Sequence, residues 1–180
     1  MKDTISVKTI EMVQDIFQQG DERYNDYQSA IDVAEFIDNN AIIVEKKEID
    51  AVKIPKKEID EINGPQQYYK ALAKRVSDKK GYRFIGYEKN FPGGIVDALA
   101  EDTSGNKIAI ECCSCRISKA ISYLEEENTI LWILSISDKP IEVTKYPLFI
   151  IKRGPNWDAV YKRYNGWRIN LIKNVKSPRD

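Results

Sequence analysis

The sequence predicts an α/β protein with a central mixed β-sheet flanked by helices. Three observations support this fold class. Stretches with apolar residues at helical spacing alternate along the chain with short β-branched runs. A Ser-Gly-Asn turn at 104–106 separates two alternating segments, which indicates a β-hairpin. The run over 129–136 is almost continuously apolar, as is typical of a strand buried on both faces of a sheet.

The first 60 residues predict an N-terminal appendage that contains helices and a hairpin. Its expected elements are helices over 5–18 and about 25–38 and short strands over 41–45 and 51–54. A charge-rich stretch interrupted by Pro55 follows. We therefore place the start of the main domain, residues 61–180, close to this stretch.

The main domain predicts the element order αβββαβ. Pro65 marks the start of its first helix because proline lacks only an N–H that has no helical partner there, and Gly81 marks its end. The expected elements are a helix over 65–79, strands over 82–88, 95–101 and 107–113, a helical stripe over 117–124 and a strand over 129–136. Beyond them we expect a strand over 148–152, a helix over 157–164 and a last strand over 167–172.

Composition excludes several classes of function. The chain has 180 residues, with 28 Lys and Arg against 28 Asp and Glu, so any nucleic-acid surface must be a local basic patch. No apolar run approaches the roughly 20 residues of a membrane span, and the N-terminus lacks a signal-peptide core. We therefore expect a cytoplasmic protein without a membrane partner.

Histidine is absent, which excludes histidine bases, histidine-dependent triads and zinc sites that contain histidine. The three cysteines are Cys112, Cys113 and Cys115, and their spacing is poorly suited to a disulfide framework. They could bind zinc or an iron–sulfur cluster, but a fourth ligand is missing. We expect small buried hydrophobic residues instead.

Two acidic residues occupy the predicted hairpin, Asp97 on its first strand and Glu111 on its second. Facing side chains on paired strands come within about 5 Å of each other. Carboxylates are the ligands that Mg²⁺ or Mn²⁺ prefers, so this pair predicts a metal site. In the alternative interpretation, Asp97 is a solvent-facing strand end and Glu111 forms an ion pair with Lys107 or Arg116.

The segments GGIVDALAED and IAIECCSC, in this element order, resemble the PD-(D/E)XK nuclease superfamily. That superfamily includes restriction endonucleases and archaeal Holliday-junction resolvases, and the resemblance covers about 65–136. It implies a restriction-endonuclease-like αβββαβ core and cleavage of phosphodiester bonds in DNA by metal-activated water. It further implies that Asp97, Glu111 and the carbonyl of Cys112 hold Mg²⁺ or Mn²⁺.

The chain departs from this superfamily at the lysine of its motif, where Cys113 stands. In some members the lysine has moved to the following helix, so Lys119 is the catalytic candidate and Arg116 its substitute. Helical phase argues against Lys119, because it lies about 150–200° from the apolar stripe of its helix and should point outward unless the helix begins at Ser118 and the residues before it curl back. The flexible stem of lysine makes that reach possible. From the first helix, Gln66 or Gln67 could complete the site.

Basic residues suggest where DNA would bind. The expected nucleic-acid contacts are Lys70, Lys74, Arg75 and Arg116. Residues 1–60 have two candidate roles, homodimerisation and substrate recognition. The functional hypotheses are a metal-dependent deoxyribonuclease, a catalytically inactive nuclease fold that binds DNA or protein, and an interaction protein without a nucleic-acid function.

Overall fold

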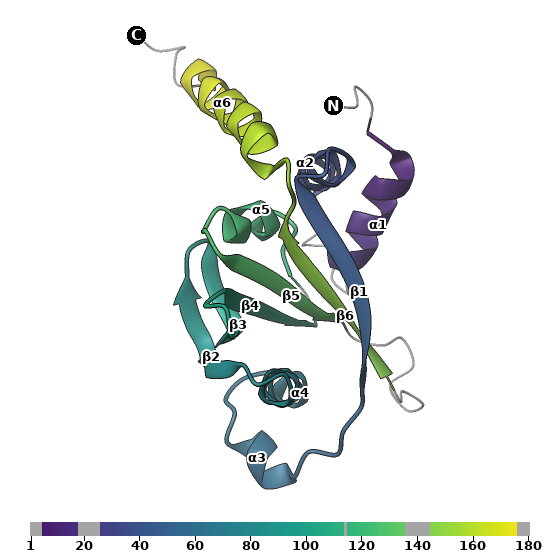
Figure 1. Cartoon of the computed structure of the whole chain (residues 1–180), viewed down its shortest axis with the longest axis vertical. Helices are drawn as coiled ribbons and strands as arrows, with labels where there is room; N and C mark the ends of the chain where they lie inside the picture. The colour runs from purple at the N-terminus through teal and green to yellow at the C-terminus, as the bar shows by residue number, and fades with distance from the viewer. Residues whose placement is uncertain (1–4, 18–25, 114, 136–144, 176–180) are drawn as a thin grey trace.

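The computed structural model confirms an α/β protein, built on a six-stranded mixed open sheet with helices on both faces (Figure 1). It describes residues 5–17, 26–113, 115–135 and 145–175. The strands are β1 (Ile42–Asp50), β2 (Arg83–Phe91), β3 (Gly94–Glu101), β4 (Lys107–Cys113), β5 (Thr129–Ser135) and β6 (Lys145–Arg153). They lie in the order β1-β6-β5-β4-β3-β2, an arrangement compatible with a restriction-endonuclease-like fold.

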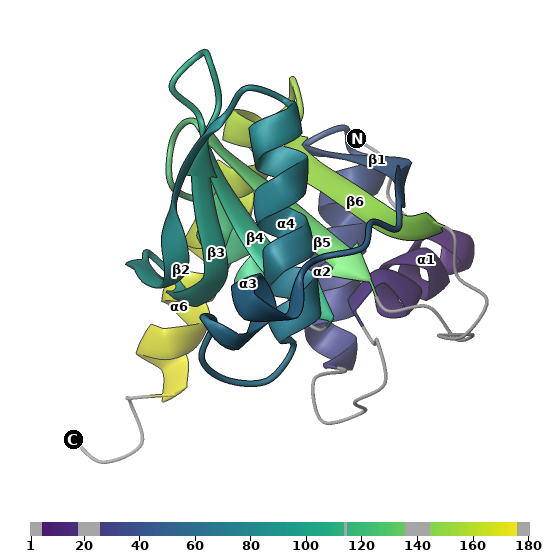
Figure 2. The same ribbon diagram turned by 90° about the horizontal axis from the view of Figure 1, so that it is seen from below.

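Two layers of helices cover the sheet. The helices are α1 (Val7–Phe17), α2 (Tyr27–Asp38), α3 (Lys56–Asp60), α4 (Gln67–Lys79), α5 (Lys119–Leu124) and α6 (Trp157–Val175). Helix α4 lies across one face with α3 beside it, whereas α2, α5 and the start of α6 lie on the other (Figures 1 and 2). Among the described helices, none has both the length and the apolar character needed to cross a lipid bilayer.

The hairpin of β3 and β4 is formed as predicted. Its turn is closed by the Asp102 carboxylate, which accepts hydrogen bonds from the backbone N–H groups of Ser104 and Asn106. Gly105 adopts a φ of +86°, which favours glycine. Strand β4 then pairs in parallel with β5 through the crossover helix α5, so the predicted order αβββαβ from α4 to β5 is confirmed.

The alternation of side chains along β4 determines which residues face α5. Ile108, Ile110 and Cys112 belong to the core under α4, whereas Ala109 belongs to the core shared with α5. Glu111 shares the parity of Ala109 and therefore points toward α5. The hairpin thus presents Glu111 on the face that the crossover helix covers.

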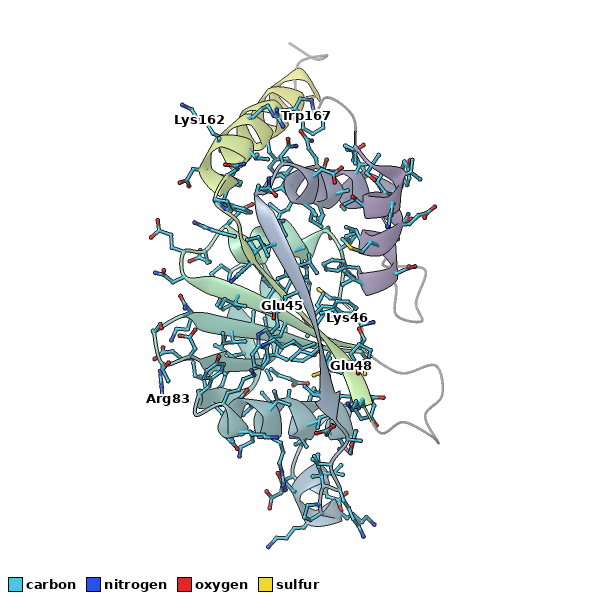
Figure 3. All side chains as sticks on the ribbon, turned by 45° about the vertical axis from the view of Figure 1, so that its right-hand side comes forward. Glu45, Lys46, Glu48, Arg83, Lys162 and Trp167 are labelled. Atoms are coloured by element: carbon cyan, nitrogen blue, oxygen red, sulfur yellow. The ribbon has the colours of Figure 1, made fainter. Side chains whose placement is uncertain are left out.

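The predicted N-terminal hairpin over 41–45 and 51–54 is wrong. Residues 42–50 form one continuous strand, β1, and residues 51–55 are not in a strand. Strand β1 pairs antiparallel with β6 along its whole length, at an edge of the sheet where charged side chains such as Glu45, Lys46 and Glu48 remain exposed (Figure 3). The charged residues in the middle of this stretch resembled a turn in the sequence. Charged side chains are equally compatible with a strand at the edge of a sheet, and that is where they lie. The sheet therefore continues across the boundary placed near residue 60.

The predicted last strand over 167–172 is also wrong, because helix α6 runs from Trp157 to Val175 without interruption. Trp157 and Val160 anchor its start in the core, and Trp167 lies exposed further along (Figure 3). Strand β6 already has β5 on one side and β1 on the other. Both sides of β6, the strand that precedes this segment, are therefore already paired.

Candidate active site

The paired acidic residues lie in one surface depression at the end of the hairpin opposite its turn. The depression is lined by Gln66, Ile95, Asp97, Glu111, Cys115, Arg116 and Lys119. It therefore combines residues from β3, β4, the segment after β4, the start of α5 and the residue before α4. Five parts of the chain thus meet at the depression that holds the two carboxylates.

Asp97 is held by the backbone of the neighbouring strand. The paired register of β3 and β4 extends as far as Ala98 and Ile110. One residue further, the Asp97 carboxylate accepts a hydrogen bond of 2.7 Å from the backbone N–H of Cys112. The side chain therefore continues the link between the strands beyond the last backbone pair, and this orients the carboxylate.

Glu111 is buried, with 4% of its surface exposed, and it has two polar neighbours on α5. The Tyr123 hydroxyl donates a hydrogen bond of 2.6 Å to Glu111 Oε1. The ammonium of Lys119 lies 3.8 Å from the same oxygen. One carboxylate oxygen is thus shared between a hydroxyl and a cation.

The charge state of Glu111 is strongly perturbed. Burial raises its pKa to about 8, and the adjacent Asp97 carboxylate adds to this effect, whereas Tyr123 and Lys119 oppose it. Burial beside Glu111 also raises the pKa of Tyr123, so its hydroxyl remains a donor. Without a further positive charge, Glu111 is largely protonated at neutral pH. A divalent cation between the two carboxylates would favour the ionised form.

Lys119 reaches the site, although its helical phase alone predicts that it points outward, because the helix begins with Ser118 as its N-cap, which is the exception that the sequence left open. Lys119 is the first residue of α5, and its N–H bonds the Arg116 carbonyl in the turn that precedes the helix. The apolar stripe, which includes Ile117 and Ala120, is buried as predicted. The lysine passes close to Gly94, where an added Cβ would lie 3.2 Å from its Nζ. The missing side chain at Gly94 opens the path to Glu111.

The cysteines are buried, free thiols. Burial raises the pKa of Cys113, at the position of the motif lysine, to about 12, and it also raises the pKa of Cys112 and Cys115. These thiols are therefore neutral, as expected for small buried hydrophobic residues. Within the described ranges, no group of three or more Cys, Asp or Glu side chains is arranged to hold a metal. The protein side chains available to a cation here are the carboxylates of Asp97 and Glu111.

The basic residues predicted to bind DNA do not form one surface. Lys70 is buried on α4 and forms a 2.9 Å ion pair with Glu88, so it is not placed to contact a phosphate. Lys74 and Arg75 lie on the same helix, on the sheet face opposite α5, and pair with Asp78 and Glu58 respectively. Arg116 instead lines the depression beside the carboxylates.

Three further residues bear on the site, the two candidate glutamines and Tyr123. Of the two candidate glutamines, Gln66 lines the depression, whereas the Gln67 side chain donates to the Ile62 carbonyl. Sequence reasoning missed Tyr123. Its spacing of four residues from Lys119, which places both on one side of a helix, is the signal that could have identified it.

The comparisons with known proteins provide no evidence about the function of the chain. No family model, curated protein or solved structure matches the chain. The function of the chain is therefore inferred from the geometry and chemistry of its site rather than from its fold.

Proposed function

We propose that this protein is a metal-dependent nuclease that hydrolyses phosphodiester bonds in DNA. The observation that carries the proposal is the 3.8 Å separation between Lys119 Nζ and Glu111 Oε1, in the depression that also contains Asp97. The pair of acidic residues and the cation are the parts that the resemblance to PD-(D/E)XK nucleases requires. In this proposal, Lys119 at the start of α5 provides the positive charge that Cys113 cannot provide.

The donor set suits a hard divalent cation. Asp97 and Glu111 offer carboxylate oxygens, which Mg²⁺ and Mn²⁺ prefer, and the resemblance adds the carbonyl of Cys112. When bound, such an ion polarises a phosphoryl oxygen and makes water a better nucleophile. The Cys112 N–H and the Tyr123 hydroxyl orient the two carboxylates before any ligand arrives.

The remaining polar side chains have roles that follow from their positions. In this proposal, Lys119 stabilises negative charge that develops on the phosphate and helps to position the attacking water. Arg116, on the wall of the depression, contacts a phosphate of the substrate through its guanidinium. Both roles place the scissile phosphate over the carboxylate pair.

Substitution of the site residues tests the proposal. We expect Asp97→Asn and Glu111→Gln each to abolish Mg²⁺-dependent cleavage of plasmid, single-stranded and branched DNA. Lys119→Met should lower kcat by roughly 10²–10³-fold, because it removes one charge that stabilises the transition state. Lys74→Met is the matched control, a lysine on the opposite face of the sheet. Cleavage that survives both carboxylate substitutions would show the assignment to be wrong.

A second candidate function is a catalytically inactive nuclease fold that binds DNA. It is favoured by the neutral thiol of Cys113 at the motif position and by the hydrogen bond that already occupies Glu111. This function predicts no heat of binding on titration with Mg²⁺ or Mn²⁺ to on the order of 1 mM. It also predicts DNA binding that weakens with salt. Metal binding accompanied by turnover would exclude it.

A further inference from the structure

The start of β3 and one side of α5 are in unusually close contact. An added Cβ at Gly93 would lie 3.0 Å from Tyr123 Cδ1 and 3.1 Å from Ser122 Cβ, and one at Gly94 would lie 3.2 Å from Lys119 Nζ. Both glycines have positive φ, +101° and +149°. The Gly93-Gly94 pair is therefore a backbone surface against which α5 rests without intervening side chains.

Tyr123 lies at the centre of this contact. Its side chain is fully buried, and its ring meets the ring of Phe91 edge-on at a centroid separation of 5.8 Å. The Lys119 ammonium lies 5.9 Å from the centroid of the same ring. The hydroxyl ends on Glu111, so one side chain contacts the metal-binding carboxylate, the lysine and the glycine surface.

We infer that Tyr123 is a positioning residue, which orients the Glu111 carboxylate through its hydroxyl and, with Gly93 and Gly94, sets the place of the Lys119 ammonium. The functional meaning of this inference rests on the proposed nuclease activity. The alternative is that Tyr123 only fills the core. A phenylalanine would then serve equally well, because its ring makes the same packing contacts.

The two roles differ in what the hydroxyl contributes. A buried tyrosine hydroxyl requires a partner, and here the partner is a proposed metal ligand. Loss of a group that orients a metal ligand typically lowers metal affinity or activity by 10–100-fold. Loss of a hydroxyl elsewhere in the protein has no such effect on the metal.

Tyr123→Phe tests the hydroxyl because it retains the ring. We expect the affinity for Mn²⁺, measured by calorimetry without DNA, to fall by roughly 10–100-fold. The kcat for DNA should fall by a similar factor while KM stays unchanged. Tyr68→Phe is the matched control, because its hydroxyl is also hydrogen-bonded, to the Val52 carbonyl and to Tyr146, on the opposite face of the sheet. A Tyr123→Phe protein that binds Mn²⁺ and turns over within about twofold of the wild type would overturn the inference.

Gly94→Ala tests the glycine surface. Its control is Gly105→Ala, which also has positive φ but meets no atom within 4 Å of the added Cβ. The readout is the side-chain NMR signal of Lys119 in protein labelled at lysine Cε, assigned with Lys119→Arg. We expect this signal to shift in Gly94→Ala and Tyr123→Phe and to stay in place in Gly105→Ala and Tyr68→Phe.

This readout needs neither metal nor DNA, so it separates the two proposals. If the wild type neither binds Mn²⁺ nor cleaves DNA while the Lys119 signal responds as expected, the nuclease proposal fails and the positioning arrangement stands. If the Lys119 signal does not shift in either Gly94→Ala or Tyr123→Phe, the positioning inference fails, whether or not the protein cleaves DNA. Should Gly94→Ala not fold, Tyr123→Phe alone decides, because its packing is retained.

Discussion

Glu111 combines deep burial with three polar neighbours, and its charge state governs what the depression can bind. Burial and the Asp97 carboxylate favour the neutral form, whereas the Tyr123 hydroxyl and the Lys119 ammonium favour the ionised form. The first two effects win in the absence of a ligand, since the pKa rises to about 8. A buried carboxyl of this kind is characteristic of functional sites, because it costs stability that a purely structural residue would not require.

The raised pKa of Glu111 predicts a specific dependence of stability on pH. An unfolded glutamate releases its proton near 4.5, whereas the native one retains it up to about 8. Between these values the native state binds more protons, so the free energy of unfolding of the metal-free protein should fall as pH rises. Glu111→Gln keeps an acceptor for Tyr123 and removes the effect. We expect it to be more stabilising at pH 8 than at pH 5 by roughly 1–3 kcal/mol in urea unfolding.

Glu101→Gln provides the control for this prediction. The pKa of Glu101 is lowered by hydrogen bonds from Lys107 and Arg83, so its pH dependence has the opposite sign and lies at lower pH. If wild-type protein and Glu111→Gln lose stability in parallel between pH 5 and pH 8, the pKa of Glu111 is not raised in the native state.

At the scale of the helices, α4 and the start of α5 differ in how their cations are used. On α4, Lys70 is buried against Glu88 and Arg75 forms a 2.6 Å ion pair with Glu58, so these charges link α4 to β2 and α3. Arg116, just before α5, lies in the depression with the carboxylates. Under the proposed function, a DNA phosphate at the carboxylates would meet Arg116 rather than the paired cations of α4.

Arg116 is consequently expected to contribute more to DNA affinity than the cations of α4. Arg116→Gln should weaken binding and lower the slope of log affinity against log salt by about 1, because one phosphate contact is lost. Arg75→Gln should leave that slope unchanged. Fluorescence anisotropy with labelled DNA over a series of KCl concentrations, in Ca²⁺ to prevent cleavage, measures both. A larger loss in Arg75→Gln would instead support α4 as the DNA-binding helix.

At the scale of the whole molecule, the N-terminal segment is part of the main core. Strand β1 covers β6 along its full length, and α1 and α2 bury Phe17, Val33 and Phe36 in the cluster that also contains Trp157 of α6. The β3–β4 hairpin and α5 contribute to the same cluster through residues such as Val96. The support of the site therefore extends to segments far away in the sequence.

Removal of residues 1–60 should therefore prevent stable folding. The truncated chain would expose the β6 edge and the apolar surface that α1 and α2 cover. We expect residues 61–180 to show no cooperative thermal transition by circular dichroism, in contrast to the full chain. A cooperative transition in the truncated chain would support the independent main domain that the sequence predicted.

The elements near the site were predictable because their signals are local. The Ser-Gly-Asn turn and the alternation on either side of it define β3 and β4, and a hairpin necessarily brings Asp97 close to Glu111. The buried strand β5 followed from its apolar run. The strand predicted over 167–172 was wrong, because an apolar pattern over so few residues is compatible with the end of a long helix as well as with a strand.

The sequence by itself determined the αβββαβ order and the paired carboxylates, and it placed Cys113 where the motif it resembles has lysine. Only the tertiary structure decided that Lys119 reaches Glu111, that Tyr123 binds the same oxygen, and that β1 completes the sheet. The physical reason is the range of the interactions. Periodicity and turn chemistry act over a few residues, whereas the close approach of α5 to Gly94 and the pairing of β1 with β6 join segments that only the folded chain brings together.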